Sequence, residues 1–255
     1  MKDYLVFRLY GPMAAWGEIA IGESRHSATH PSKSAILGLM AAALGIRRDE
    51  DERQTELASA YGIGVKLLTP GSLLKDYHTA QVPRAEKNVR YFTRKQELEA
   101  GSDKIGTILS SREYRCDSLA IVAVWGKQNT LPYTLQHLVN KLARPEFHLY
   151  LGRKSCPLSA PVQARVLTFP DLRTALDKTH FCALYMAAGN IICPSPIENE
   201  LLPVGTIRYF WEETENAGME AVQSTQRYDQ PTSRSRWQFD SREEHMSLAG
   251  GNHVS

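Results

Sequence analysis

The stretch that decides the fold is Leu119-Ala120-Ile121-Val122-Ala123-Val124-Trp125. An unbroken apolar run of this length predicts a strand that is buried on both faces of a sheet. Leucines then recur at helical spacing from Leu131 to Leu142, which predicts an amphipathic helix over about Pro132–Leu142. A doubly buried strand followed by such a helix indicates a layered α+β domain.

Elements on either side of this pair extend the pattern. Tyr4–Leu9 alternates, which predicts a half-buried strand. Ala35–Leu44 is apolar nearly all round, which predicts a helix that packs on the sheet and ends at Gly45. Further strands are expected at Ile63–Leu67 and Val162–Phe169. The order strand, helix, strand, excursion, strand, helix, strand is that of the ferredoxin-like or RNA-recognition fold.

We therefore expect one domain with additions. Residues 1–170 would form an RRM-like core with a modified ferredoxin-like fold. After a returning strand at Leu73–Thr79, a thumb is inserted at about residues 80–111, where sustained periodicity is lost. Residues 171–247 would form a β-rich C-terminal extension packed on the core, and residues 248–255 a disordered tail.

Composition limits the compartment and the chemistry. The chain has 255 residues, 42% of them hydrophobic, and a net charge of +2, so a nucleic-acid partner is allowed but not required. No apolar run reaches the ~20 residues of a membrane span. The cysteines form no Cys-x-x-Cys pair and stand far apart at Cys116, Cys156, Cys182 and Cys193. We expect a cytoplasmic protein with no membrane partner, no metal site and no cofactor.

A basic turn lies within His148–Pro157, which reads His-Leu-Tyr-Leu-Gly-Arg-Lys-Ser-Cys-Pro. A short strand at residues 149–151 would lead into Gly152, whose missing Cβ lets a polyanion backbone approach closely. Arg153 and Lys154 would neutralise phosphate, and Ser155 would donate a hydrogen bond to it. A solvated turn between two strands explains the same residues.

The start of the first helix is a second candidate anion site. Lys33 and Ser34 follow Pro31-Ser32, and the free N–H groups and positive dipole end of a helix attract phosphate. A serine that only caps the helix is compatible with this interpretation. Trp16, in a loop after the first strand, is better explained as a core anchor than as a base-stacking platform.

The thumb segment and a later segment mix cations with aromatic residues. Between Arg84 and Lys95 five basic residues, including Arg90, accompany only one acid, and Tyr91 and Phe92 lie among them. Cations that follow phosphates and rings that stack on bases suit a single-stranded nucleic acid. A second cluster consists of Arg234, Arg236 and Arg242 around Trp237 and Phe239.

Several motifs occur in a fixed order along the chain. They are Leu9-Tyr10-Gly11-Pro12-Met13-Ala14-Ala15-Trp16-Gly17, Pro31-Ser32-Lys33-Ser34 before Gly38-Leu39, Leu44-Gly45-Ile46 with Arg48-Asp49, Asp76-Tyr77-His78-Thr79, Arg112-Glu113-Tyr114 with Cys116-Asp117, and Tyr150-Leu151-Gly152-Arg153-Lys154-Ser155-Cys156-Pro157-Leu158. The match runs to about residue 160 and resumes at Gln238-Phe239 and Ser241-Arg242-Glu243. Together these motifs closely resemble the CasD family, the fifth Cas protein of type I-E CRISPR Cascade complexes.

The resemblance implies a modified RNA-recognition fold with a protruding thumb. It implies a non-catalytic, RNA-binding subunit that holds the 5′ handle of the crRNA and caps one end of the backbone filament. Its partners would be the backbone subunit of the CasC family, the large subunit of the CasA family that reads the PAM, and target DNA indirectly through the complex. Arg112 matches an arginine that contacts RNA in the family, and Tyr77, His78 and Tyr114 lie in the matching motifs.

Two other functions remain open. A metal-independent endoribonuclease that processes CRISPR repeat RNA would need a base for the ribose 2′-OH and cations for the phosphorane, and Tyr77, His78, His26 and Lys33 are the candidates. A DNA-binding module is not favoured, because no helix clusters Arg, Asn and Gln on one face. The acidic segment Glu212–Glu220 is a candidate subunit contact.

Overall fold

The computed structural model describes residues 1–20, 22–84, 89–99, 101, 103–181, 186–187, 190–191, 206–214 and 216–249. The strands of its main sheet are β1 (Lys2–Tyr10), β4 (Tyr61–Thr69), β7 (Leu119–Gly126), β8 (Arg165–Phe169), β11 (Ile207–Trp211), β12 (Gln223–Ser233) and β13 (Gln238–Ala249). They lie in the order β12-β13-β11-β4-β7-β1-β8, and every pair is antiparallel. The described helices are α1 (Lys33–Leu44), α2 (Asp51–Ala60), α3 (Arg94–Leu98), α4 (Leu135–Ala143) and α5 (Leu172–Lys178).

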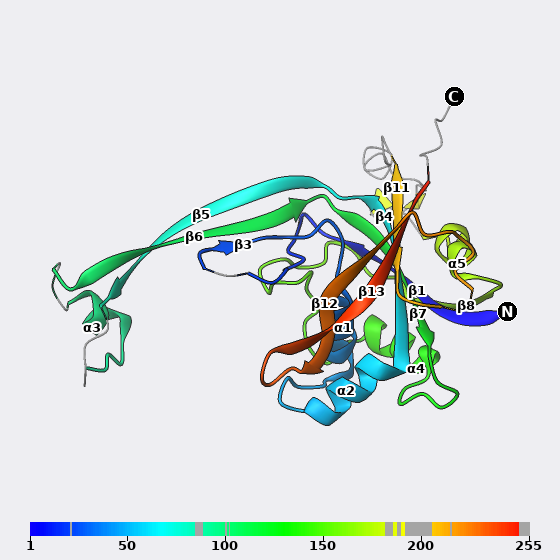
Figure 1. The fold of residues 1–255 in the computed structure, drawn as a ribbon, viewed down its shortest axis with the longest axis horizontal. Coiled ribbons are helices and arrows are strands. Elements are labelled where there is room, and N and C mark those ends of the chain that lie inside the picture. Colours follow the sequence, from blue (N-terminus) through cyan, green and yellow to red (C-terminus); the bar gives the residue numbers. More distant parts are fainter. Residues whose placement is uncertain are drawn as a thin grey trace.

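Helices cover both faces of this sheet. The leucines of α4 and most apolar residues of α1 share one core with Leu5, Phe7 and Val122. The buried residues of α5 share a second core with Tyr4 and Val6 on the opposite face. Figure 1 shows α5 and α1 on opposite sides of the sheet.

The central strand confirms the prediction from its sequence. In β7, Val122 and Val124 face the first core, whereas Ile121, Ala123 and Trp125 face the second. The prediction for β1 was wrong in one respect: this strand is buried on both faces, not one. Its second face, which carries Tyr4, Val6 and Arg8, is covered because α5 packs over it.

Helix α1 ends where predicted but begins at Lys33, two residues before the expected start at Ala35. The Ser32 hydroxyl accepts a hydrogen bond from the N–H of Ala35 at the start of α1, and Gly45 ends the helix with φ of 76°. The carboxylate of Asp171 caps α5 in the same way, 2.7 Å from the N–H of Thr174. Helix α4 begins later than expected, because Thr134 is its cap.

The thumb is a regular ribbon, not irregular chain. Strands β5 (Ser72–Pro83) and β6 (Ile105–Cys116) pair without interruption and project from the body to a tip that carries α3 (Figure 1). The expected boundaries of about 80–111 were therefore wrong on both sides. Periodicity failed as a signal because neither face of the outer ribbon is buried, so apolar residues follow no pattern. Two short strands, β2 (Met13–Ala14) and β3 (Ser24–Arg25), pair with β6 at its root.

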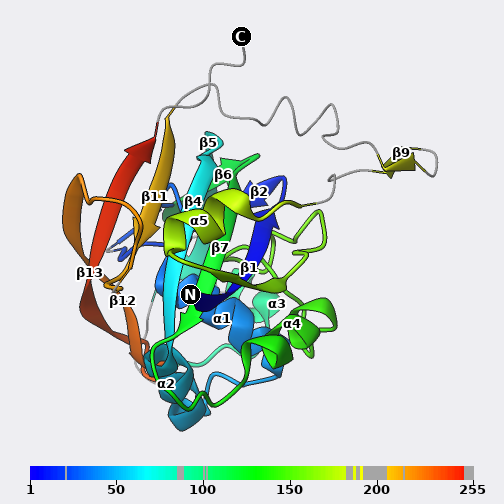
Figure 2. The ribbon, with the colours of Figure 1, turned by 90° about the vertical axis from the view of Figure 1, so that its right-hand side faces the viewer.

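The C-terminal strands continue the core sheet beyond β4 (Figure 2). Tyr209 and Trp211 of β11 are buried in the second core, so the region expected as an extension shares the core itself. β13 extends to Ala249, past the expected start of the tail at 248, and residues 250–255 lie outside the described residues. Within the described part of the chain, no helix is long and apolar enough to cross a membrane.

Candidate nucleic-acid interface

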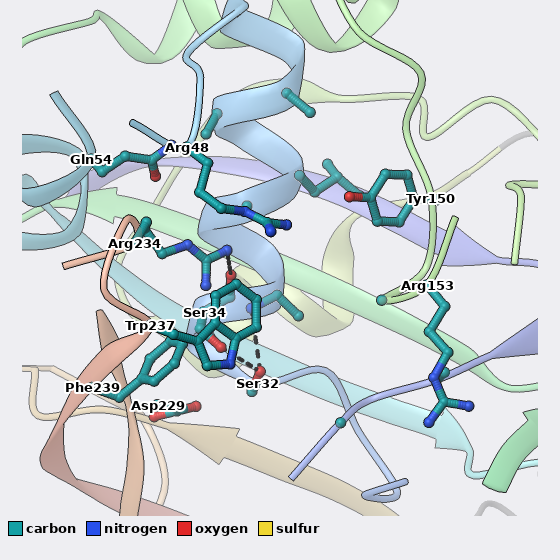
Figure 3. Close-up of a pocket in the computed structure, with 18 of the residues that line it drawn as sticks. Ser32, Ser34, Arg48, Gln54, Tyr150, Arg153, Asp229, Arg234, Trp237 and Phe239 are labelled. Carbon is teal, nitrogen blue, oxygen red and sulfur yellow. Dashed lines mark hydrogen bonds between the residues drawn. The ribbon is translucent and has the colours of Figure 1, made fainter. Parts of the chain in front are cut away.

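A cleft of about 1670 Å³ runs beside helix α1 (Figure 3). Its floor is a row of small residues on α1, in which Ser34, Gly38 and Ala42 recur every four positions. The loop 145–154 forms one wall, and the hairpin of β12 and β13 forms the other. The small side chains keep the floor low, so the space above α1 stays open.

The lining of this cleft is basic and aromatic. The cations that line it are Arg25, Arg47, Arg48, Arg153, Lys154, Arg227 and Arg234, and its acids are Glu18, Glu146 and Asp229. Its aromatic residues are Phe147, His148, Tyr150, Tyr228, Trp237 and Phe239. Cations with interleaved rings are the surface that single-stranded nucleic acid prefers.

The glycine turn forms part of the first wall. Gly152 has φ of 84°, and a Cβ on it would lie 1.8 Å from the carbonyl oxygen of Ala15. The missing Cβ is therefore required by the protein's own backbone, a role of Gly152 that the sequence did not indicate. The strand expected at residues 149–151 is a single bridge between Tyr150 and Pro157.

Arg153 is held in place by the body of the protein. Its guanidinium lies 4.8 Å from the ring centre of Tyr114 and donates hydrogen bonds to the carbonyl oxygens of Glu113 at 3.2 Å and Arg25 at 3.4 Å. Tyr114 is consequently buried beneath Arg153, and this corrects its expected role at an RNA surface. Lys154 and Ser155 are exposed in the adjacent turn.

The start of α1 does not offer the expected anion site. The N–H of Lys33 donates to the Asp229 carboxylate at 2.7 Å, so an acid of the chain itself meets the positive helix end. The Lys33 ammonium is buried and contacts both carboxylate oxygens of Glu212, at 3.0 and 2.9 Å. Burial lowers the pKa of Lys33, and the Glu212 charge opposes that effect. Ser34 alone of this pair lines the cleft.

Glu212 is also an interior residue and not a surface acid. One of its oxygens accepts the N–H of Ile63 at 2.8 Å, and the other accepts from Lys127 at 2.8 Å. With Lys33, these contacts join β11, β4 and α1. Glu212 therefore cannot belong to an acidic subunit contact as expected.

The ribbon carries a second group of candidate residues. Tyr77, His78 and Arg112 are exposed on it. Because side chains alternate along a strand, His78 shares a face with Arg112, whereas Tyr77 points to the opposite face. His78 hydrogen-bonds Asp76 on its own face.

The tip of the thumb holds the remaining predicted cations. Arg84 and Arg90 are exposed there, and the guanidinium of Arg90 lies 5.3 Å from the ring centre of Phe92. The ribbon therefore carries these cations at its outer end, away from the cleft beside α1 (Figure 1).

The second basic–aromatic cluster in the sequence divides in space. Arg234 lies 5.4 Å from the ring centre of Trp237 and 5.7 Å from that of Phe239, inside the cleft. Arg242 is instead half-buried outside the cleft, where it bonds to Asp229 at 2.6 Å and Glu244 at 2.7 Å. Of this cluster, Arg234, Trp237 and Phe239 line the cleft.

The family described as CRISPR-associated protein (Cas_Cas5) matches residues 4–244. The chain belongs to the Cas5 family. The CRISPR system Cascade subunit CasD of Escherichia coli (strain K12) is 33% identical to this Cas5 chain over 184 residues, which are 69% of this chain and 76% of that protein. This relationship confirms the resemblance to the CasD family.

Solved structures share the fold of this Cas5 chain. A chain described as CRISPR RNA-guided surveillance complex has a TM-score of 0.58 and 21% identity, and the match covers 97% of this chain and 90% of that one. A structure described as a Cas protein has a TM-score of 0.56 and 24% identity, with coverages of 98% and 97%. At these identities the matches establish a common mixed α/β fold.

The predicted site residues thus fall into three groups in this Cas5 protein. Ser34, Gly152, Arg153 and Lys154 line the cleft, and Ser155 is next to it. Tyr77, His78, Arg84, Arg90 and Arg112 lie on the thumb, whereas Lys33 and Tyr114 are buried. Sequence reasoning did not select Arg48, Arg234 and Trp237. The basic–aromatic cluster in the sequence indicated Arg234 and Trp237, but no pattern in the sequence connected Arg48 to them.

Proposed function

We propose that this Cas5 protein is a non-catalytic, RNA-binding subunit of a type I-E CRISPR Cascade surveillance complex. It would hold the 5′ handle of the crRNA, cap the backbone filament and serve RNA-guided DNA recognition in antiviral defence. The observation that carries the proposal is the basic and aromatic cleft along α1, in a chain related to a Cascade subunit. This function would be carried out in the cytoplasm, where the RNA is transcribed.

The core of the protein is, in this proposal, a modified ferredoxin-like fold. The order β4-β7-β1-β8, with α1 between β1 and β4 in the chain and α4 between β7 and β8, supports it. The added β11 to β13 occupy the free edge of β4. They supply one wall of the cleft, so this addition enlarges the RNA site beyond the core.

The RNA would follow the cleft and then the thumb. Arg153 and Lys154 would bind phosphates at the cleft wall, with hydrogen bonds from Ser34 and Ser155. Arg112 would continue this path at the root of the ribbon, where β6 pairs with β3 beside Arg25. The remaining thumb residues of the proposed path are Tyr77, His78, Arg84 and Arg90.

The outer thumb also offers a surface for protein partners. Exposed apolar side chains lie on both faces of the ribbon, Leu74 and Ile108 on the face of His78 and Leu73 and Leu109 on the face of Tyr77. Apolar side chains that a projecting element leaves exposed favour a protein contact. We assign it to the backbone subunit of the CasC family, with the large subunit of the CasA family as a further neighbour and target DNA reached through the complex.

A metal-independent endoribonuclease is the second candidate function. His78 is exposed beside Tyr77 and hydrogen-bonds a carboxylate, which is an arrangement that can move a proton. However, Lys33 is buried in its ion pair with Glu212 and cannot neutralise a phosphorane. His26 hydrogen-bonds Glu113 at 3.1 Å and is a second group of the same kind as His78. Because the cation expected for the phosphorane is buried, the RNA-holding function is favoured.

A binding and cleavage assay separates the two functions. The purified chain, alone and with the backbone subunit, is mixed with labelled CRISPR repeat RNA in EDTA over a series of salt concentrations. We expect intact RNA to be retained, with an affinity that falls as salt rises. Arg112→Ala and Lys154→Ala should each weaken binding, whereas Lys178→Ala, on α5 across the sheet, should not.

Cleavage would contradict the proposal. A discrete cut within the repeat that disappears in His78→Ala would make the protein a processing nuclease. Equal affinity for the repeat RNA and for an unrelated RNA of the same length would leave no handle-holding role.

A further inference from the structure

Trp237 lies at the cleft with most of its surface open. The chain has four tryptophans, all of them within the described residues. Trp16, Trp125 and Trp211 are at most 4% exposed, whereas Trp237 is 59% exposed. A large ring that is left open costs hydrophobic stabilisation, so its position calls for a partner.

Two guanidinium groups converge on this ring. Arg48 lies 4.8 Å and Arg234 5.4 Å from the ring centre of Trp237, although the two arginines come from distant parts of the chain. Figure 3 shows both arginines beside Trp237 over helix α1, with Tyr150 and Arg153 across the cleft. Both guanidiniums thus lie over the ring, which is 59% exposed beside a cleft of about 1670 Å³.

Neither guanidinium is neutralised by the part of the protein that the structure describes. No carboxylate there forms an ion pair with Arg48 or Arg234, and the one side-chain hydrogen bond of Arg234 goes to the carbonyl oxygen of Ser34 at 3.5 Å. Burial and the neighbouring charge of Arg48 lower the pKa of Arg234. Two like charges held together without an ion-paired carboxylate favour an anionic ligand.

The backbone holds this arrangement before any ligand arrives. The carboxylate of Asp51, on α2, accepts hydrogen bonds from the N–H groups of Arg234 at 2.9 Å and Ser235 at 3.1 Å, and from the hydroxyl of Ser233 at 2.8 Å. The hydrogen bond from the Ser235 hydroxyl, together with these bonds, lowers the pKa of Asp51 to about 2, so its carboxylate is charged at neutral pH. Trp237 itself has φ of 59°, a strained conformation that positions the ring.

We propose that Arg48, Arg234 and Trp237 form a subsite for one unpaired nucleotide of the bound RNA. The base stacks on Trp237, and the adjoining phosphate lies between the two guanidiniums. Phe239 supports the ring edge-on at 5.7 Å between ring centres. This inference rests on the proposed RNA-binding function and adds to it a specific stacking site.

The subsite can be followed by its own fluorescence. A stacked base quenches tryptophan, and only Trp237 is accessible to one. RNA of the handle sequence is titrated into the full chain, and tryptophan emission is recorded together with the anisotropy of a label on the RNA. The same titration with Trp237→Phe supplies the background of the buried tryptophans.

Variants separate stacking from charge. We expect Trp237→Ala to weaken RNA binding roughly tenfold, because base–aromatic stacking contributes about 1–3 kcal/mol. Trp237→Phe should keep most of the affinity but lose the quenching. Arg48→Ala with Arg234→Ala should weaken binding and reduce its salt dependence. Arg236→Ala, an exposed neighbour outside the cleft, is the matched control.

The outcomes distinguish this subsite from the function on which it rests. If the RNA binds but quenching is absent and Trp237→Ala binds normally, the subsite is wrong while the proposed function stands. If no RNA binds at all, both fail. Tighter binding of single-stranded DNA of the same sequence, or quenching only by a protein subunit, would also overturn the assignment to RNA.

Discussion

Glu212 shows how one buried carboxylate joins distant elements. It bonds to Lys33 of α1, to Lys127 after β7 and to the backbone of β4. A charge in this position is stable only while its partners remain, because an unpaired buried charge is not solvated. The added strand β11 is thereby tied to the core through its last residues.

We predict that Glu212→Gln destabilises the fold by about 3–5 kcal/mol, because the buried Lys33 ammonium loses its counter-charge. Urea unfolding followed by circular dichroism measures the change in the free energy of unfolding. Glu213→Gln, at an exposed neighbouring position, should change it by less than about 0.5 kcal/mol. Equal stability of the two variants would contradict this role of Glu212.

A second prediction concerns acid stability and Glu244. Burial raises the pKa of this carboxyl, but the hydrogen bond and charge of His30 and the charges of Arg227 and Arg242 outweigh that effect and hold it at about 2. A carboxyl whose pKa is lower in the folded state stabilises the protein at pH values above its pKa in the unfolded state. This stabilisation is lost as the pH falls through the pKa of the folded state. The free energy of unfolding should therefore fall between about pH 5 and pH 2.

Glu244→Gln is the test of that prediction. The variant should be less stable at pH 7, and the pH dependence of its stability between about pH 5 and pH 2 should be flatter than in the parent. Thermal unfolding at each pH gives the comparison. A parallel pH dependence in both proteins would assign acid sensitivity to other groups.

At the scale of elements, the ribbon and the hairpin of β12 and β13 contribute differently. The outer ribbon buries no core, and its apolar residues are exposed. The hairpin pairs with the main sheet and also forms a wall of the cleft. Changes in the tip of the ribbon should therefore affect binding, and changes in the hairpin should affect both binding and stability.

We predict that residues 84–104 can be replaced by Asn-Gly, which joins Pro83 to its partner Ile105 through a two-residue turn. The melting temperature should stay within about 3 °C of the parent, because the described helix of the tip, α3, packs on the ribbon itself. Affinity for the handle RNA, measured by anisotropy, should fall severalfold as the tip cations are lost. Unchanged affinity would show that the tip serves a protein partner instead.

For the whole molecule, the net charge of +2 does not reflect the cleft, which is lined by seven cations and three acids. Several acids are consumed by internal pairs, as in the contacts of Asp229 and Glu244 with Arg242. Among the described residues, the cations of the cleft other than Arg227 form no ion pair and are left to face a ligand. RNA binding should therefore depend on salt far more than the total charge indicates.

The salt dependence gives a quantitative prediction. For single strands the logarithm of the binding constant falls with that of the salt concentration by about 0.7 per phosphate contact. Lys154→Ala should reduce this slope by about 0.7 to 1. Lys178→Ala should leave it unchanged, because that lysine lies on α5, on the opposite face of the sheet. Equal slopes in both variants would remove Lys154 from the RNA path.

Sequence patterns determined the parts of this protein that depend on neighbouring residues. The doubly buried β7 followed from its apolar run, and the ends of α1 followed from Ser32 and Gly45. Both could be predicted because the spacing of apolar residues and the capping of a helix depend on residues that are close together in sequence. The ordered motifs also indicated the family. The strand expected at Leu73–Thr79 lies within β5, but the outer part of the ribbon escaped prediction because its strands pair with each other and bury no face.

Tertiary structure alone decided which cations can bind RNA. Lys33 and Arg242 lie beside the candidate residues in sequence, yet carboxylates from other elements neutralise them. Arg48 and Arg234 are 186 positions apart in sequence, yet the fold places both against Trp237. Charge pairing depends on contacts between distant segments, so only the folded chain determines which positive charges remain for a ligand.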